Sequence, residues 1–145
     1  MKTKRVSHIG ILVHDVDDAV KKWTDNYGFK KFDDMRIEVE GIRSAFISPN
    51  GTWNEMTIEL MEPLDKLDQN NALVRRLASV GEGFYHICLD VEDVEESGRE
   101  LQDAGCKVFL RDPIDENHSN RWLVHPKDSN GVMVEGKLTN QRLSR

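Results

Sequence analysis

The stretch His8-Ile-Gly-Ile-Leu-Val-His-Asp-Val16 recurs later in the chain as His86-Ile-Cys-Leu-Asp-Val-Glu-Asp-Val94. Five of the nine positions are identical, at a constant offset of 78 residues (86 − 8). Internal repeats decide the architecture of a chain, so they are the first feature to weigh when a fold is inferred. We therefore expect two related halves in which the same elements follow one another.

A glutamate follows each copy of the repeat further along the chain, and these two glutamates lie 76 residues apart (135 − 59). One imidazole and one carboxylate thus come from each copy, namely His8 and Glu59 from the first and His86 and Glu135 from the second. Two imidazoles and two carboxylates suit a divalent first-row ion, such as Zn, Co, Ni, Mn or Fe(II). We predict that these four side chains bind one such ion.

The hydrophobic pattern predicts the order βαβββ in both copies. Alternating runs rich in β-branched residues indicate strands. Helical spacing after Asp15 and Asp93 indicates two helices, which Gly28 and Gly105 end. This order of elements predicts an α+β fold. The predicted strands are residues 4–13, 29–39, 42–48, 55–62, 84–91, 106–110, 120–125 and 132–138, and a further short helix is predicted at 71–80.

The predicted elements divide the chain into two modules. The first module is residues 1–64 and the second is residues 83–138, with a connector at 65–82 and a polar tail at 139–145. A chain of 145 residues is long enough for one compact domain, or for two half-domains that share a core.

Strand alternation decides which side chains share a face of the predicted sheet. Apolar residues such as Ile9, Ile87 and Val134 form faces that can pack under the two helices. The four candidate ligands all fall on the opposite face. The simpler alternative is that the histidines are hydrogen-bonded sheet residues and that the glutamates face solvent. The recurrence of all four at repeat-related positions favours the metal site.

Composition excludes several classes of protein. The net charge is −6 and the basic residues are scattered, unlike the basic footprint of a nucleic-acid binder. The chain has no run of 18 apolar residues and no signal peptide, so we expect a cytoplasmic protein without a membrane partner. Cys88 and Cys106 match neither a zinc spacing nor a disulfide framework, and we expect small buried thiols.

Five other polar residues are weaker candidates for a site. His14 precedes a helix and is predicted to be solvated, and His125 is predicted to form a local hydrogen bond. His118 lies in a predicted surface loop. Arg121 and Lys127 are predicted to be solvated, with contact to a phosphate or carboxylate group as the alternative.

These residues together resemble the vicinal oxygen chelate superfamily, which includes glyoxalase I, extradiol dioxygenases, antibiotic-resistance proteins and methylmalonyl-CoA epimerases. The likeness covers most of the chain and is greatest to the epimerases. It implies that the two βαβββ modules form a curved, cup-like eight-stranded sheet with metal ligands on the first and last strand of each module, and it implies a homodimer. The motifs that carry it are His8-Ile-Gly-Ile, Ile58-Glu-Leu-Met-Glu-Pro-Leu64, Gly81-Glu-Gly-Phe-Tyr-His-Ile87, His125-Pro-Lys-Asp128 and Gly131-Val-Met-Val-Glu135.

The resemblance implies a divalent-metal-dependent epimerase or isomerase that removes a proton next to a carbonyl. Its substrate is expected to be an acyl-CoA such as methylmalonyl-CoA. The pKa of such a proton is far above that of any side chain, so the reaction needs a Lewis acid and a positioned base. We predict that Glu135 and Glu59 are catalytic. Either carboxylate takes the proton while the other returns one to the opposite face.

Other functions remain as alternatives. A glyoxalase I-type lactoylglutathione lyase or isomerase would use the same ligands on a thiol conjugate. A ligand-sequestering resistance protein fits less well, because such members typically lack the metal residues. An extradiol dioxygenase also fits less well. It would bind Fe(II) through two histidines and one carboxylate and would have no ligand at the position of Glu59. Two departures from epimerases bear on the substrate: Ser44 stands where some epimerases carry another glutamate, and residues 115–120 replace a glycine-rich loop.

Overall fold

The structure is a computed structural model that describes residues 1–139 of the chain. These residues form two compact units, one made of residues 1–9 and those from 85 onward, the other of residues 10–84. The module boundaries expected from the sequence are a different division and stay a prediction. Residues 140–145 of the expected tail lie outside the described residues. No helix within residues 1–139 has the length and apolar character needed to cross a bilayer.

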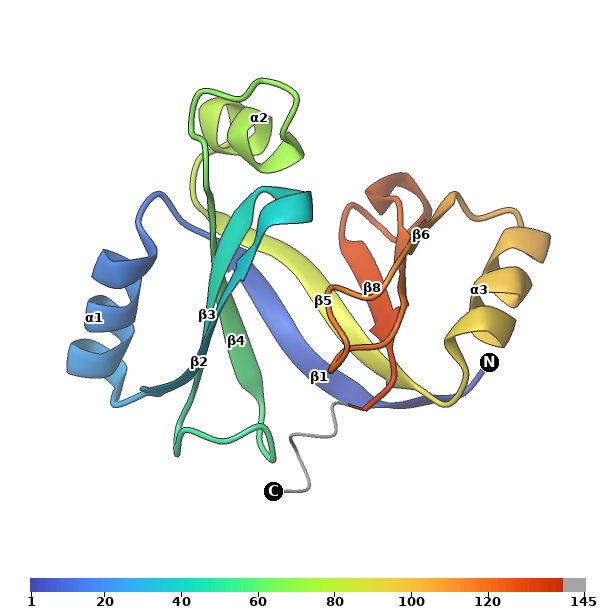
Figure 1. The fold of residues 1–145 in the computed structure, drawn as a ribbon, viewed down its shortest axis with the longest axis horizontal. Coiled ribbons are helices and arrows are strands. Elements are labelled where there is room, and N and C mark those ends of the chain that lie inside the picture. The colour runs from blue at the N-terminus through green and yellow to red at the C-terminus, as the bar shows by residue number, and fades with distance from the viewer. Residues whose placement is uncertain (140–145) are drawn as a thin grey trace. The chain divides into compact units, whose positions relative to one another are not determined.

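Residues 1–139 contain eight strands and three α-helices in the predicted order, with one helix in the connector (Figure 1). Hydrogen bonds join the strands into an eight-stranded sheet, so the predicted α+β class is confirmed. The strands are β1 (Thr3–Leu12), β2 (Lys30–Ile37), β3 (Ile42–Ser48), β4 (Thr57–Pro63), β5 (Gly83–Val91), β6 (Val108–Arg111), β7 (Arg121–Val124) and β8 (Met133–Lys137). The helices are α1 (Val16–Tyr27), α2 (Ala72–Ser79) and α3 (Val94–Asp103), with 3₁₀ turns η1 (Glu38–Glu40) and η2 (Pro126–Asp128).

The helices α1 and α3 begin at equivalent capping aspartates. Asp15 accepts a hydrogen bond from the backbone N–H of Asp18 at 3.0 Å, and Asp93 accepts one from that of Glu96 at 2.8 Å. Each bond satisfies an N–H group that has no partner within the helix. The residue after α1, Gly28, has φ +74°, a left-handed conformation that glycine adopts without strain. The helices predicted after Asp15 and Asp93, and the predicted stop at Gly28, are confirmed.

In the unit of residues 10–84, α1 packs against β3 and β4. Ala45 and Leu60 are partners across these antiparallel strands, and both are fully buried. Val16, at the start of α1, is also fully buried. The apolar face predicted for β4 is therefore the face of a packed core, and alternation directs Glu59 to the other face.

In the unit of residues 1–9 and 85 onward, α3 packs against β6 and β7. Figure 1 shows this helix alongside the strands of the second βαβββ module. Leu89 of β5 and Val134 of β8 belong to the core, as alternation predicted. The buried core residues are Val91, Val94, Trp122 and Val124, surrounded by Leu89, Leu101, Cys106, Val108 and Val134.

Trp122 joins α3 to the sheet. Its indole N–H donates to the hydroxyl of Ser97 on α3 at 2.8 Å, and its side chain is almost completely buried. On the strand side the ring lies over Gly136, its register partner in β8. A Cβ atom on Gly136 would lie 2.1 Å from two ring carbons. Glycine is required at this position because the indole ring occupies the space of a side chain.

Replacing Gly136 with alanine should destabilise the protein by about 1–3 kcal/mol or more, because the added methyl group would overlap the Trp122 ring. Gly98→Ala on α3 is the matched control, since its Cβ would meet Trp122 at an ordinary contact distance of 3.5 Å. The control should be neutral or stabilising by up to about 1 kcal/mol, because alanine favours the helix. Urea unfolding measures both changes, and wild-type stability in Gly136→Ala would contradict this packing.

Candidate metal centre

Two imidazoles and one carboxylate converge in the unit of residues 1–9 and 85 onward. Nε2 of His8 lies 3.3 Å from Nε2 of His86. Oε1 of Glu135 lies 3.7 Å from the His8 nitrogen and 3.5 Å from the His86 nitrogen. All three residues are buried, with 4–6% of their surface exposed. The structure therefore brings His8, His86 and Glu135 together within this unit.

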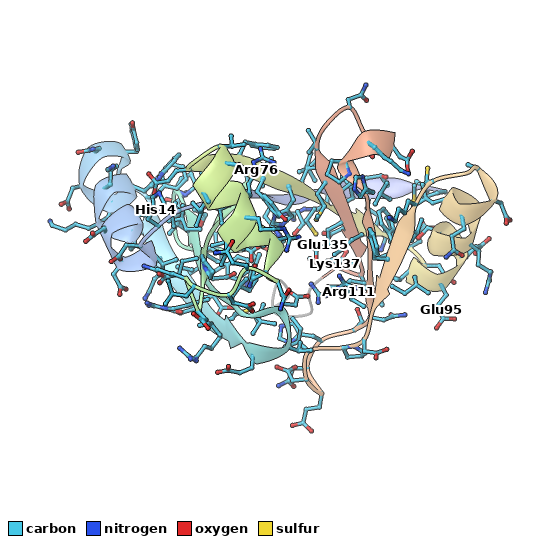
Figure 2. The ribbon with its side chains drawn as sticks, turned by 90° about the horizontal axis from the view of Figure 1, so that it is seen from above. His14, Arg76, Glu95, Arg111, Glu135 and Lys137 are labelled. Atoms are coloured by element: carbon cyan, nitrogen blue, oxygen red, sulfur yellow. The ribbon has the colours of Figure 1, made fainter. Side chains whose placement is uncertain are left out.

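The strand register explains why His86 and Glu135 share a face. β5 and β8 are parallel neighbours in which Cys88 is the partner of Glu135. His86 is two residues before Cys88, so it lies on the same face as both. Figure 2 labels Glu135 among the side chains of β8. This face lies opposite Leu89 and Val134, as alternation predicted.

The three converging atoms fit a small divalent ion. A triangle with sides of 3.3, 3.5 and 3.7 Å has a centre roughly 2.0 Å from each corner, and zinc–nitrogen and zinc–oxygen bonds are about 2.0–2.2 Å long. Two imidazole nitrogens this close need a shared proton or a common cation. The thiol of Cys88 is a further donor within the same 4.8 Å grouping as His8 and Glu135. This part of the chain is thus a possible metal site.

The second ring nitrogen of His8 lies near a hydroxyl group. Oγ of Ser7 is 3.3 Å from Nδ1 of His8, and Ser7 is almost completely buried. A partner at the second nitrogen orients an imidazole ligand and leaves the first nitrogen for the metal. Sequence analysis did not identify Ser7, because adjacent strand residues are expected on opposite faces.

Glu135 is ionised and held from two sides. Its Oε2 accepts a hydrogen bond from Nη1 of Arg121 at 2.8 Å. Burial alone would raise the pKa of the Glu135 carboxyl, but the hydrogen bond from His86 and the positive charges of His86, Arg121 and His8 lower this pKa below its usual range. The predicted solvation of Arg121 is wrong: its side chain is only 12% exposed, because the carboxylate of Glu135 draws it into the sheet face.

The fourth predicted ligand, Glu59, lies on β4 in the unit of residues 10–84. The hydroxyl of Ser44 on β3 donates to Oε2 of Glu59 at 2.5 Å, and both residues are buried. The register pairs Phe46 with Glu59, so Ser44 is its diagonal neighbour. Ser44, which the resemblance marked as a departure, therefore contacts a predicted ligand. No local pattern indicates this contact, because it depends on the register of β3 and β4.

The other polar candidates have local roles. His14 is exposed, as predicted, and is labelled in Figure 2. Nδ1 of His125 accepts from the backbone N–H of Lys127 at 3.0 Å, which confirms the predicted local bond. His118 contacts Asp115 within its loop, 2.6 Å apart. The two cysteines are free thiols, of which Cys88 is buried and Cys106 half-buried.

The family model of the glyoxalase/bleomycin resistance protein/dioxygenase superfamily matches residues 7–124. This chain belongs to that superfamily. The match covers most of both βαβββ modules and confirms the family that the repeat and its motifs indicated.

The similar proteins include acyl-CoA epimerases. The ethylmalonyl-CoA/methylmalonyl-CoA epimerase of Cereibacter sphaeroides is 29% identical over 133 residues, which are 90% of this chain and 95% of that protein. The structure of a variant of Streptomyces coelicolor methylmalonyl-CoA epimerase in complex with 2-nitronate-propionyl-CoA is 30% identical, with a TM-score of 0.81. That likeness covers 95% of this chain and 99% of the other.

A lactoylglutathione lyase of Oryza sativa subsp. japonica is also similar. It is 24% identical over 134 residues, which are 91% of this chain but only 42% of that protein. These three relatives are enzymes, and the two epimerases named above match over 95% and 99% of their own length.

In the metal-free protein, the carboxyl group of Glu135 should stay ionised as the pH falls through 4.5, the usual value of a glutamate pKa. Because the folded-state pKa is lowered, the carboxylate contributes stability that is present above the unfolded-state pKa and is lost as the pH falls through the folded-state value. The carboxyl ¹³C shift, assigned by comparison with Glu135→Gln, measures this titration. A midpoint at or above 4.5 would contradict the contacts described.

Proposed function

We propose that this protein is a divalent-metal-dependent epimerase that acts on an acyl-CoA, with methylmalonyl-CoA as its substrate. One observation carries the proposal. His8, His86 and Glu135 converge in a buried cluster, in a chain whose similar proteins include methylmalonyl-CoA epimerases. The predicted function thus agrees with these relatives.

The residues proposed to hold the ion are His8, His86 and Glu135, with Glu59 as the fourth ligand. The donor set of two imidazoles and two carboxylates suits Co, Mn, Ni, Zn or Fe(II). A divalent ion bound there would act as a Lewis acid on the substrate carbonyl oxygen. His8 and His86 are buried, so bulk water has little access to the nitrogens that would bind the ion.

The proton chemistry is proposed for the two glutamates. A carboxylate beside the α-carbon acts as a general base and contributes on the order of 100- to 10,000-fold to the rate. Glu135 and Glu59 are the candidate bases: either would loosen from the ion to take the proton, and the other would return one to the opposite face. Ser44 donates its hydroxyl hydrogen to Oε2 of Glu59, which orients this carboxylate.

The runner-up is a lactoylglutathione lyase-type reaction on a thiol conjugate. The same ligands would serve it, and a lyase of this kind is among the relatives. The Cereibacter sphaeroides epimerase and the Streptomyces coelicolor epimerase structure match at 29% and 30% identity, which favours the epimerase. A ligand-sequestering protein would not need the buried imidazole pair.

Protein reconstituted with a divalent ion should catalyse deuterium incorporation at the α-carbon of methylmalonyl-CoA in heavy water. The exchange should be faster than in the no-enzyme control and should be lost with a chelator, because the enolate needs Lewis-acid stabilisation. Mass spectrometry follows the incorporation. One bound ion per chain without any exchange would exclude this substrate, and the hemithioacetal of glutathione and methylglyoxal then tests the lyase.

Glu135→Gln should abolish turnover, and Glu59→Gln should lower it by at least about 100-fold, the lower range for loss of a general base. Glu95→Gln is the control, because this exposed glutamate lies in the first turn of α3 and is labelled in Figure 2. Exchange rates and bound metal are measured together. Turnover retained in Glu135→Gln at full metal occupancy would remove Glu135 from the base role.

A homodimer and a cytoplasmic location complete the proposal. The dimer rests on the resemblance to the superfamily, whose members often pair. Light scattering of the purified chain measures its mass, for which 16.7 kDa is the monomer value.

A further inference from the structure

Arg121 reaches the metal centre from a neighbouring strand. The register pairs Leu123 of β7 with Glu135 of β8, so Arg121, two residues before Leu123, lies on the same face as Glu135. Nη1 of Arg121 donates to Oε2 of Glu135 at 2.8 Å. The side chains are 12% and 8% exposed, so water has little access to the pair.

The two carboxylate oxygens of Glu135 therefore have different partners. Oε2 is bound by the guanidinium of Arg121, whereas Oε1 faces the Nε2 atoms of His8 and His86. A charge-assisted hydrogen bond of this length resists rotation of the carboxylate. Arginine suits the role because its planar, weakly hydrated guanidinium stays charged at all working pH values.

We infer that Arg121 is a positioning residue that presents a single oxygen of Glu135, Oε1, to the metal. This inference rests on the metal centre of the proposed function and not on the identity of the substrate. Residues that orient metal ligands in this way typically change metal affinity or activity about 10- to 100-fold when they are removed.

A contact with the substrate is the competing role for an arginine in this place. An anionic group of an acyl-CoA would be a suitable partner for a guanidinium. In that case loss of Arg121 would raise KM and leave metal binding unchanged. The two roles therefore differ in a measurement that needs no substrate.

The test is titration of the metal-free protein with Co(II), read by calorimetry and by the visible absorption of the bound ion. Arg121→Gln should raise the Kd for Co(II) about 10- to 100-fold. It should also alter the visible spectrum, because the freed Oε2 can join the coordination. Arg121→Lys keeps the charge but not the planar fork, so it should bind Co(II) with intermediate affinity.

Arg111→Gln is the matched control. Arg111 is the register partner of Arg121 on β6, is exposed, and packs over the ring of Phe109. Figure 2 labels it at the end of that strand. This variant removes the same charge from the adjacent position, and its Co(II) affinity and spectrum should equal those of the wild type.

Wild-type Kd and spectrum in Arg121→Gln would overturn the inference, and so would a wild-type protein that binds no Co(II). A raised KM for methylmalonyl-CoA with unchanged Co(II) binding would assign Arg121 to the substrate instead. If Arg121→Gln does not fold, Arg121→Lys provides the test. Wild-type Co(II) binding by Arg121→Lys would contradict the claim that the planar guanidinium positions Glu135. An altered Co(II) site in a wild-type protein that exchanges no methylmalonyl-CoA would support the inference and contradict only the proposed function.

Discussion

The buried contact between the imidazoles of His8 and His86 and the carboxylate of Glu135 constrains the unit of residues 1–9 and 85 onward. A buried polar group left without a partner costs about 1–3 kcal/mol. Here Arg121 binds Glu135 and Ser7 contacts His8, so these two members of the cluster have further partners. Apolar residues of similar volume would often pack as stably. A functional role therefore explains this polar cluster better than a contribution to stability does. Ionisable groups with shifted pKa values cluster at functional sites.

Two adjacent residues of β7 support the centre from both faces of the sheet. Trp122 lies over Gly136 on the helix-covered face, and its indole is bonded to Ser97 of α3. Arg121 binds Glu135 on the other face. The Trp122 ring therefore contacts Gly136, and Arg121 binds the adjacent residue of β8, Glu135. Packing of the core and orientation of a proposed metal ligand are parts of the same strand pairing.

Local patterns predicted much of the fold and part of the site. Alternation and helical spacing predicted the order of elements, and the repeat of residues 8–16 located both histidines and the starts of both helices. Contacts that depend on register were missed, because no local pattern states which residues of two strands are partners. Arg121 was expected in solvent, Ser44 was seen only as a departure, and the fit of Trp122 on Gly136 was not anticipated. The joining of Glu59 to the other three ligands stays a prediction.

X-ray absorption of the zinc-loaded protein tests the central claim most directly, because it identifies the atoms that bind the ion. The account predicts nitrogen and oxygen neighbours at about 2.0–2.2 Å, with outer-shell scattering from two imidazoles and no sulfur. Cys88 makes the test sharp, since its thiol lies in the same buried group as His8 and Glu135. A sulfur neighbour at about 2.3 Å, or a spectrum without imidazole scattering, would contradict the assignment of the histidines and glutamates as the metal ligands.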